Sequence, residues 1–257
     1  MTEHVRVTVE GGIMRLTLAR PEKKNALTSA MYGTLADSLI RADSDRNVRT
    51  VLFEAEGDVF TAGNDINDFA AVASGTRPRS EMRGFDFITQ LGKAQKPLVA
   101  AVSGHAVGVG LTMLLHCDLV FVAEDAKLSV PFVNLALVPE AASSLLLPAR
   151  IGHARAFAMF ALGEAIDGKT ALAYGIANAA LPRAEVRPRA LAAAEALALR
   201  PLESVVATKK LMRDSEAISG VMAREGALFS ERLKSPEAAE AFRAFAERRP
   251  PDFRKLG

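Results

Sequence analysis

Two turns of small residues have the composition needed to bind a developing negative charge. They cover residues 60–66 (FTAGNDI) and 104–110 (GHAVGVG), and each lies beside an apolar stretch. Small residues let a ligand approach the main chain, and N–H groups at a helix start carry partial positive charge. Two N–H groups, one from each turn, could together bind one oxyanion. The sequence alone leaves open whether these segments are only tight turns.

A single carboxylate, Glu140, follows Pro139 at the end of a run that has no charged residue from Leu128 onwards. A carboxyl group in apolar surroundings has a raised pKa, which suits a general base. The alternative is that Glu140 caps a helix beginning near Ala142. Both interpretations are open at this point.

The sequence motifs of other common active sites and binding sites are absent. The sequence has no complete dinucleotide fingerprint, no phosphate loop and no nucleophile elbow. No histidine or cysteine pair has the spacing of metal ligands, so we expect no metal. We interpret His105 as a polar turn residue and Cys117 as a small buried side chain.

The elements that must position these segments follow an α/β pattern. Alternating apolar residues predict a hairpin over residues 5–18, turning at Gly11 and Gly12. A helix capped by Thr28 or Ser29 and a strand at 50–53 follow, then a helix at about 82–94. Buried strands are expected at 98–103, 118–123 and 127–130. Helices fill residues 142–247, so the pattern favours an α/β core with a helical C-terminal region.

Composition excludes several classes of protein. The chain has 257 residues, of which 49% are hydrophobic and 24% charged, so it is neither disordered nor fibrous. Its net charge of +2, without a dense basic block, argues against nucleic-acid binding. Residues 97–117 carry no charge, but Pro97 and three glycines favour a strand, turn and helix over a membrane span. We expect a cytoplasmic protein.

Three motifs together resemble the crotonase (enoyl-CoA hydratase/isomerase) superfamily. They are RPEKKNALT at 20–28, FTAGNDINDF at 60–69, and the long segment KPLVAAVSGHAVGVG…KLSVP at 96–131. The resemblance implies a spiral of ββα units, placed at residues 1–195, and a C-terminal helical trimerisation region at 196–257. It also implies acyl-CoA substrates, no separate cofactor, and assembly as a homotrimer or as a hexamer built from two trimers.

The same resemblance implies roles for individual residues. The backbone N–H groups of Asn64 and Val109 would form the oxyanion hole. The loop that would contact the adenine and pantetheine parts of CoA consists of Ala62, Gly63, Asn64, Asp65, Ile66 and Asn67. Lys23, Lys24 and Ala26 would lie near its nucleotide end. We expect Asp65 to support the turn through hydrogen bonds to backbone.

The type of reaction depends on acidic residues. Hydratases of this superfamily use two glutamates, and the matching positions here hold Thr112 and Phe132. Glu140 and its surroundings instead resemble the peroxisomal-type Δ3,Δ2-enoyl-CoA isomerases, in which one glutamate moves the proton. We therefore expect an enoyl-CoA isomerase of fatty acid metabolism. The alternatives are hydration, hydrolysis, an aromatic-catabolism isomerisation, or an acyl-CoA-binding protein without activity. Phe85, Phe87 and Ile88 are interpreted as core residues more than as pocket residues.

Overall fold

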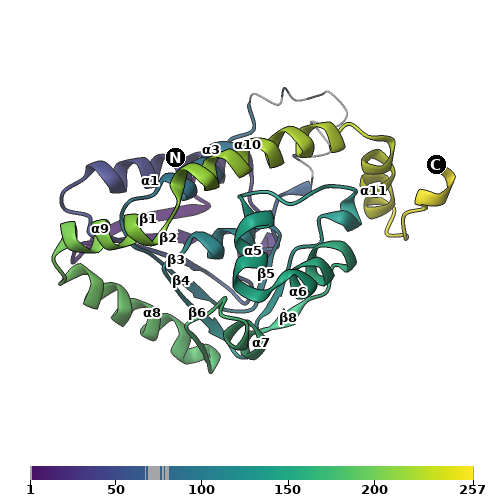
Figure 1. Cartoon of the computed structure of the whole chain (residues 1–257). Coiled ribbons are helices and arrows are strands. Elements are labelled where there is room, and N and C mark those ends of the chain that lie inside the picture. Colours follow the sequence, from purple (N-terminus) through teal and green to yellow (C-terminus); the bar gives the residue numbers. More distant parts are fainter. Residues whose placement is uncertain (1, 67, 69–75, 77, 79–80, 257) are drawn as a thin grey trace.

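The computed structural model describes residues 2–66, 68, 76, 78 and 81–256, which form two sheets and the helices around them (Figure 1). The larger sheet has six strands in the order β1-β2-β3-β4-β6-β9. Its strands are β1 (Val5–Glu10), β2 (Ile13–Leu18), β3 (Thr50–Ala55), β4 (Leu98–Val102), β6 (Leu119–Ala123) and β9 (Ala179–Leu181). Only β1 runs antiparallel to its neighbour; the other pairs are parallel. The predicted hairpin is confirmed, with φ of 57° at Gly11 and 82° at Gly12.

The smaller sheet joins β5 (His105–Val107), β7 (Lys127–Ser129) and β8 (Ile166–Asp167). β5 pairs with β7 in parallel, and β7 pairs with β8 antiparallel. The interpretation of His105 as a turn residue was therefore wrong, because His105 begins β5. A strand this short, flanked by glycines, gives no alternation that a sequence pattern can detect.

Helices cover the sheets. The helix α1 (Ser29–Ser44) begins where predicted, because Thr28 Oγ1 accepts a hydrogen bond from Met31 N at 3.3 Å. α3 (Gly84–Lys93) packs on α1, and α8 (Arg183–Ala198) packs across β3, β4 and β6. α10 (Ser215–Arg232) runs along the top of the view in Figure 1 and contacts both α3 and α5 (Ser143–Ile151). The site described below therefore lies among elements from both halves of the chain.

The remaining helical elements are mostly short. They are η1 (Pro21–Lys23), α4 (Val109–Thr112), η3 (Met113–His116), η4 (Val133–Leu135), α6 (His153–Phe157), the π-helical turn η5 (Ala158–Leu162), α7 (Gly168–Ala173), α9 (Leu202–Met212), α11 (Pro236–Ala246) and η6 (Phe253–Leu256). α10 begins at Ser215 because Asp214 caps it, accepting from Ala217 N at 2.8 Å. The α/β class and the helical second half are confirmed.

The central strands are buried on both faces, which explains their nearly continuous apolar sequence. All six residues of β3 are buried, including Glu54, which pairs with Arg15 and accepts from Thr17. α8 presents a mostly alanine face to the sheet, with Val186, Ala190 and Ala194 fully buried. Residue 195, where the sequence division was placed, falls inside α8, and that division stays a prediction.

The uncharged segment, residues 97–117, forms β4, β5, α4 and η3. No helix in the described ranges is long and apolar enough to cross a bilayer. Cys117 is buried, as expected. The described residues also contain no cluster of side chains suited to a metal ion.

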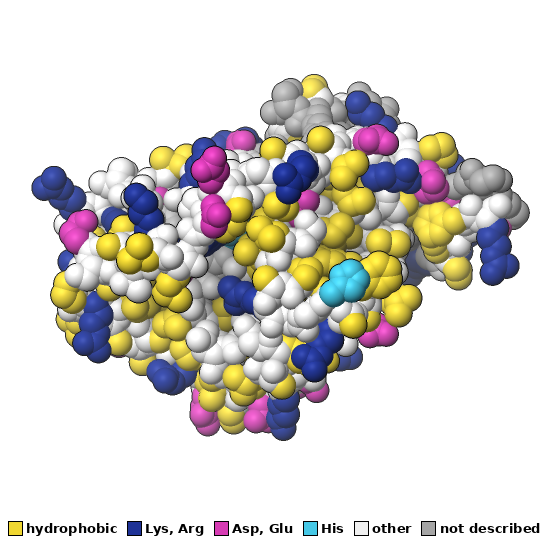
Figure 2. Space-filling view, in the orientation of Figure 1, with side chains coloured by type: hydrophobic (Ala, Val, Ile, Leu, Met, Phe, Trp, Pro, Cys, Tyr) yellow, Lys and Arg dark blue, Asp and Glu magenta, His cyan; other side chains and the backbone are white. Residues whose placement is uncertain are grey.

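The face that carries α5, α6 and α10 shows hydrophobic side chains among charged ones (Figure 2). Exposed hydrophobic residues on these elements are Leu145, Phe157 and Leu228.

Candidate active site

The fold brings the two small-residue turns together. Thr61 N donates to His105 O at 3.0 Å, and Val107 N donates to Thr61 O at 3.1 Å, which forms a parallel bridge between the turns. Glycine is needed where they meet. A Cβ atom on Gly63, whose φ is 88°, would lie 2.8 Å from Val107 O, and one on Gly110 would lie 2.5 Å from Thr61 Cγ2. The small residues therefore allow close contact between two main-chain segments.

The expected oxyanion donors come from these turns. Leu27 pairs with residues on either side of Asn64, through Leu27 N to Gly63 O at 2.8 Å and Asp65 N to Leu27 O at 3.0 Å. This pairing does not use the N–H group of Asn64. Val109 is the first residue of α4, where an N–H group has no acceptor within the helix. Neither N–H group has an acceptor among the described residues, and Asn64 and Val109 line one pocket.

The segment 20–27 lies against the first turn. Ala62 N donates to Lys24 O at 2.9 Å, and Arg20 Nη1 donates to Ala26 O at 2.9 Å. The same Arg20 nitrogen lies 2.7 Å from Asp65 Oδ2, so the Asp65 carboxylate forms an ion pair with the guanidinium that also binds Ala26 O. Lys23 and Lys24 are exposed at the rim of this arrangement. Asn67 lies outside the described residues, whereas Ile66 follows the turn and is partly buried.

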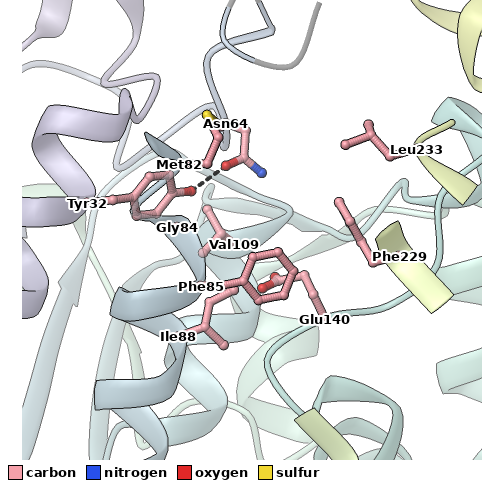
Figure 3. A pocket seen from close by; sticks show the side chains of 10 residues that line it. All are labelled: Tyr32, Asn64, Met82, Gly84, Phe85, Ile88, Val109, Glu140, Phe229 and Leu233. Atoms are coloured by element: carbon pink, nitrogen blue, oxygen red, sulfur yellow. Dashed lines mark hydrogen bonds between the residues drawn. The ribbon is translucent and has the colours of Figure 1, made fainter. Parts of the chain in front are cut away.

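The pocket has a mostly apolar wall (Figure 3). Its lining residues are Tyr32, Asn64, Met82, Gly84, Phe85, Ile88, Val109, Glu140, Phe229 and Leu233. In Figure 3, Phe229 and Leu233 lie across from Tyr32 and Val109, with the Glu140 carboxyl between the two groups. Ile88 is buried and Phe85 packs against the core, as expected, but both also line the pocket. Phe87 is fully buried against Tyr32 and Phe53. Residues three apart share one helix face, so Phe85 and Ile88 point away from Phe87.

Glu140 is the titratable group at the centre of the pocket. Its side chain is 4% exposed, and its Oε1 atom accepts a hydrogen bond from Thr112 Oγ1 at 2.6 Å. Its Oε2 atom is buried without a hydrogen-bond partner among the described residues. Burial raises the pKa of Glu140 to about 7, with a further upward effect from the Glu225 charge and an opposing effect of Thr112. The expected pKa increase is confirmed, and both protonation states are accessible near neutral pH.

The alternative role for Glu140, capping the next helix, was wrong. α5 begins at Ser143, and its N-terminal N–H groups are bound by Glu225 of α10. Ala142 N donates to Glu225 Oε2 at 2.6 Å and Ser144 N donates to Glu225 Oε1 at 2.9 Å. The Glu140 side chain therefore makes no capping bond to α5, and it lines the pocket.

The two positions at which hydratases carry glutamates have different surroundings. Thr112 is fully buried behind Glu140 and supplies its hydrogen bond. Phe132 packs on Phe160, with ring centroids 6.3 Å apart, and does not line the pocket. Within the described part of the chain, Glu140 is the single acidic side chain in the pocket wall.

Sequence reasoning missed two residues of this site. Tyr32 O–H donates to Asn64 Oδ1 at 2.5 Å, and burial raises the pKa of Tyr32 well above its usual value, so the phenol is neutral. Glu225 lies in a region that was predicted to be helical, but no role was predicted for it. Helical spacing shows which face of α1 or α10 is apolar, but it gives no signal that either residue meets a turn far away in the sequence.

Comparisons with known proteins agree with this geometry. The family model described as enoyl-CoA hydratase/isomerase matches residues 8–255. A probable enoyl-CoA hydratase of Bacillus subtilis is 32% identical over 255 residues, covering 97% of this chain and 98% of the relative. Enoyl-CoA delta isomerase 2 of Rattus norvegicus is 32% identical over 251 residues, covering 96% of this chain and 64% of the relative.

Solved structures are similar along nearly the whole chain. An enoyl-CoA hydratase/isomerase from Pseudoalteromonas atlantica superposes with a TM-score of 0.92 at 39% identity, covering 98% of this chain and 100% of its own. The Pseudomonas aeruginosa protein OdaA gives a TM-score of 0.90 at 45% identity, covering 95% of this chain and 99% of its own. The relatives carry both hydratase and isomerase names.

Proposed function

The chain belongs to the enoyl-CoA hydratase/isomerase family, and we propose that within this family it is an isomerase that converts a 3-enoyl-CoA to the conjugated 2-enoyl-CoA. The crotonase-like α/β core with C-terminal helices, expected from the sequence, is confirmed by the solved structures of the same family. The observation that carries the isomerase proposal is the single carboxylate in the pocket wall of the described chain, Glu140.

One base is sufficient for this reaction. Glu140 Oε2 takes a proton from C2 of the 3-enoyl thioester, and the electrons of the broken C2–H bond form a dienolate. The protonated Glu140 then delivers the proton to C4, and the C3=C4 double bond is replaced by C2=C3. A pKa of about 7 lets the same carboxyl group act as base and then as acid. No activated water is needed, in keeping with Thr112 and Phe132 at the two hydratase positions.

The negative charge of the dienolate lies mainly on the thioester oxygen. The N–H groups of Asn64 and Val109 are the proposed donors to that oxygen, since both are without acceptors in the described chain and both residues line the pocket. Loss of one such donor costs about 3 kcal/mol in comparable sites. Only the backbone of Val109 takes part, so its bulky side chain does not interfere.

The substrate is proposed to be held at both ends. The exposed Lys23 and Lys24, with Ala26 and the loop that begins at Ala62, form the proposed CoA contact. The acyl group would lie against Phe85, Ile88 and Phe229, which present no charge. An apolar wall favours an unsubstituted hydrocarbon chain over an acyl group that carries a free carboxylate at its far end.

The resemblance also supports a homotrimer or a hexamer. Leu199, Leu211 and Met212, at the end of α8 and of α9, are each more than 80% exposed. Large apolar side chains that are this exposed are expected to be covered in an assembly. Sedimentation of the purified protein tests this part of the proposal.

The experiment that tests the reaction is an ultraviolet assay with a 3-enoyl-CoA, which follows formation of the conjugated thioester. A 2-enoyl-CoA hydration assay is run in parallel. We expect fast conjugation, little hydration, and a loss of roughly 1,000-fold in Glu140→Gln, which is the size typical for removal of a general base. Glu231→Gln, an exposed glutamate on α10, is the matched control.

Rapid hydration with slow conjugation would identify the chain as a hydratase instead. Conjugation that is unchanged in Glu140→Gln would exclude Glu140 as the base.

A further inference from the structure

The two residues after Glu140 adopt an unusual backbone conformation. Ala141 and Ala142 have φ of 58° and 54°, in the left-handed region that alanine avoids. Two such residues in succession persist only if the surrounding structure holds them. The direction in which Glu140 points depends on this pair, because the chain turns here from the loop into α5.

Glu225 of α10 holds one side of the pair. Its buried carboxylate accepts three hydrogen bonds: from Ala142 N at 2.6 Å, from Ser144 N at 2.9 Å and from Ser144 Oγ at 2.5 Å. All three partners act as donors, which fits the ionised form of the carboxyl group. These bonds connect positions that lie more than 80 residues apart in the sequence.

His116 holds the other side. Its Nε2 atom lies 2.7 Å from Ala141 O, and its Nδ1 atom meets Arg213 Nη2. Burial lowers the pKa of His116 to about 3, so the ring is neutral. Arg213 can only donate, so Nδ1 is the acceptor and Nε2–H donates to Ala141 O. The strained pair is therefore bound through the Ala141 carbonyl and the Ala142 N–H group.

We propose that Glu225 is a positioning residue of the active site, which holds Ala141 and Ala142 in the left-handed conformation that directs Glu140 Oε2 into the pocket. This inference rests on the proposed isomerase function and extends it to the C-terminal half of the chain. α10 thus contributes to catalysis as well as to the apolar wall.

The charge of Glu225 has a second effect on the same group. The titratable groups that interact with Glu140 are Tyr32 from α1 and Glu225 from α10, and His116 from η3 bonds the adjacent Ala141 carbonyl. Tyr32 and His116 are both neutral near pH 7. Glu225 raises the pKa of Glu140, whereas Thr112 of α4 lowers it through its hydrogen bond. Removal of the Glu225 charge therefore lowers the pKa of Glu140.

The test is Glu225→Gln, which removes the charge and replaces one acceptor oxygen by an amide. We expect kcat to fall about 10- to 100-fold, as for a base displaced by roughly 1 Å, with KM changed less than about threefold. The acid limb of the pH profile of kcat/KM should move to lower pH. A purely structural role of Glu225 would not move that limb.

A readout without substrate separates this inference from the proposed function. Infrared titration of the Glu140 carboxyl band, assigned by its absence in Glu140→Gln, should also shift to lower pH in Glu225→Gln. If the band shifts but the wild-type protein has no isomerase activity, the effect of the Glu225 charge on Glu140 stands and the proposed function fails. If the wild-type protein is active and neither kcat nor the band changes, the positioning role is wrong.

Two further variants keep the test decisive. In Glu225→Gln/Ala142→Gly, glycine adopts the left-handed conformation without strain, so part of the lost kcat should return while the pH shift remains. If Glu225→Gln does not fold, Ser144→Ala removes one hydrogen bond and keeps the charge. It should lower kcat about two- to fivefold, and an unchanged kcat in a folded Ser144→Ala protein would overturn the proposal. Glu231→Gln is the control on the same helix.

Discussion

The Thr112 hydroxyl donates to one oxygen of Glu140 at 2.6 Å, and the other oxygen is buried without a hydrogen-bond partner in the described chain. The two carboxylate oxygens thus have different roles. Oε1 is held by Thr112 of α4, whereas Oε2 has no such partner and is the proposed proton acceptor. Thr112, at a position where the family resemblance places a hydratase glutamate, thus binds the one carboxylate that lines the pocket in the described chain.

Replacing Thr112 by valine removes this hydrogen bond with little change in volume. The bond lowers the pKa of Glu140, so its loss should move the acid limb of kcat/KM from about pH 7 to higher pH. A hydrogen bond to a charged group is worth roughly 1.5–3 kcal/mol, so activity at neutral pH should fall about tenfold or more. Thr112→Ser, which keeps the hydroxyl group, should retain the wild-type profile. An unchanged acid limb in Thr112→Val would contradict this account.

The raised pKa of Glu140 also makes stability depend on pH. The folded value is about 7 and the ordinary value is 4.5, so the folded state binds the proton more tightly than the unfolded state. The associated stability is fully present below the ordinary pKa and is lost as pH rises through the folded pKa. The loss between about pH 4 and pH 8 is on the order of 3 kcal/mol.

Glu140→Gln does not titrate in this range and should not show that loss. Urea unfolding of both proteins at the two pH values measures the difference. We expect the stability of Glu140→Gln relative to wild type to rise by about 3 kcal/mol from the lower to the higher pH. A difference that stays constant with pH would show that the Glu140 pKa is not raised in the folded protein.

Tyr32→Phe tests the support of the oxyanion turn. The variant removes the hydroxyl that donates to Asn64 Oδ1 and keeps the ring packed against Phe87. We expect kcat to fall about 5- to 50-fold, because the Asn64 N–H group is held less firmly. The circular dichroism spectrum should not change. Tyr174→Phe is the matched control, because Tyr174 is the second of the chain's two tyrosines and its ring contacts Arg155 at 4.3 Å.

Gly63→Ala tests the close approach of the two turns. The new Cβ would lie 2.8 Å from Val107 O, at a φ of 88° that alanine avoids. The variant should be destabilised by about 2–4 kcal/mol and should lose at least 100-fold in activity. Gly220→Ala on α10 meets nothing within 4 Å and should instead raise stability by about 1 kcal/mol in thermal unfolding. Wild-type activity in Gly63→Ala would show that the turns need not lie this close.

The parts of the protein that depend on local patterns could be predicted from the sequence. Alternation predicts β1 and β2, and apolar helical spacing with the Thr28 cap predicts α1. Glycine positions indicate the two turns, and a lone carboxylate in an apolar run indicates Glu140. Each signal lies within a few residues, because the periodicities of strands and helices and the geometry of caps and turns are local.

How these parts meet could not be predicted, because it depends on tertiary packing. The bridge from Thr61 to Ala106 places the two turns together, and the orientation of α3 turns Phe85 and Ile88 towards the pocket. Glu225 was predicted in a helix, yet its role comes from a contact 83 positions away, with Ala142. Such contacts depend on how the sheets and helices pack as a whole, and a single sequence carries no local pattern for that packing.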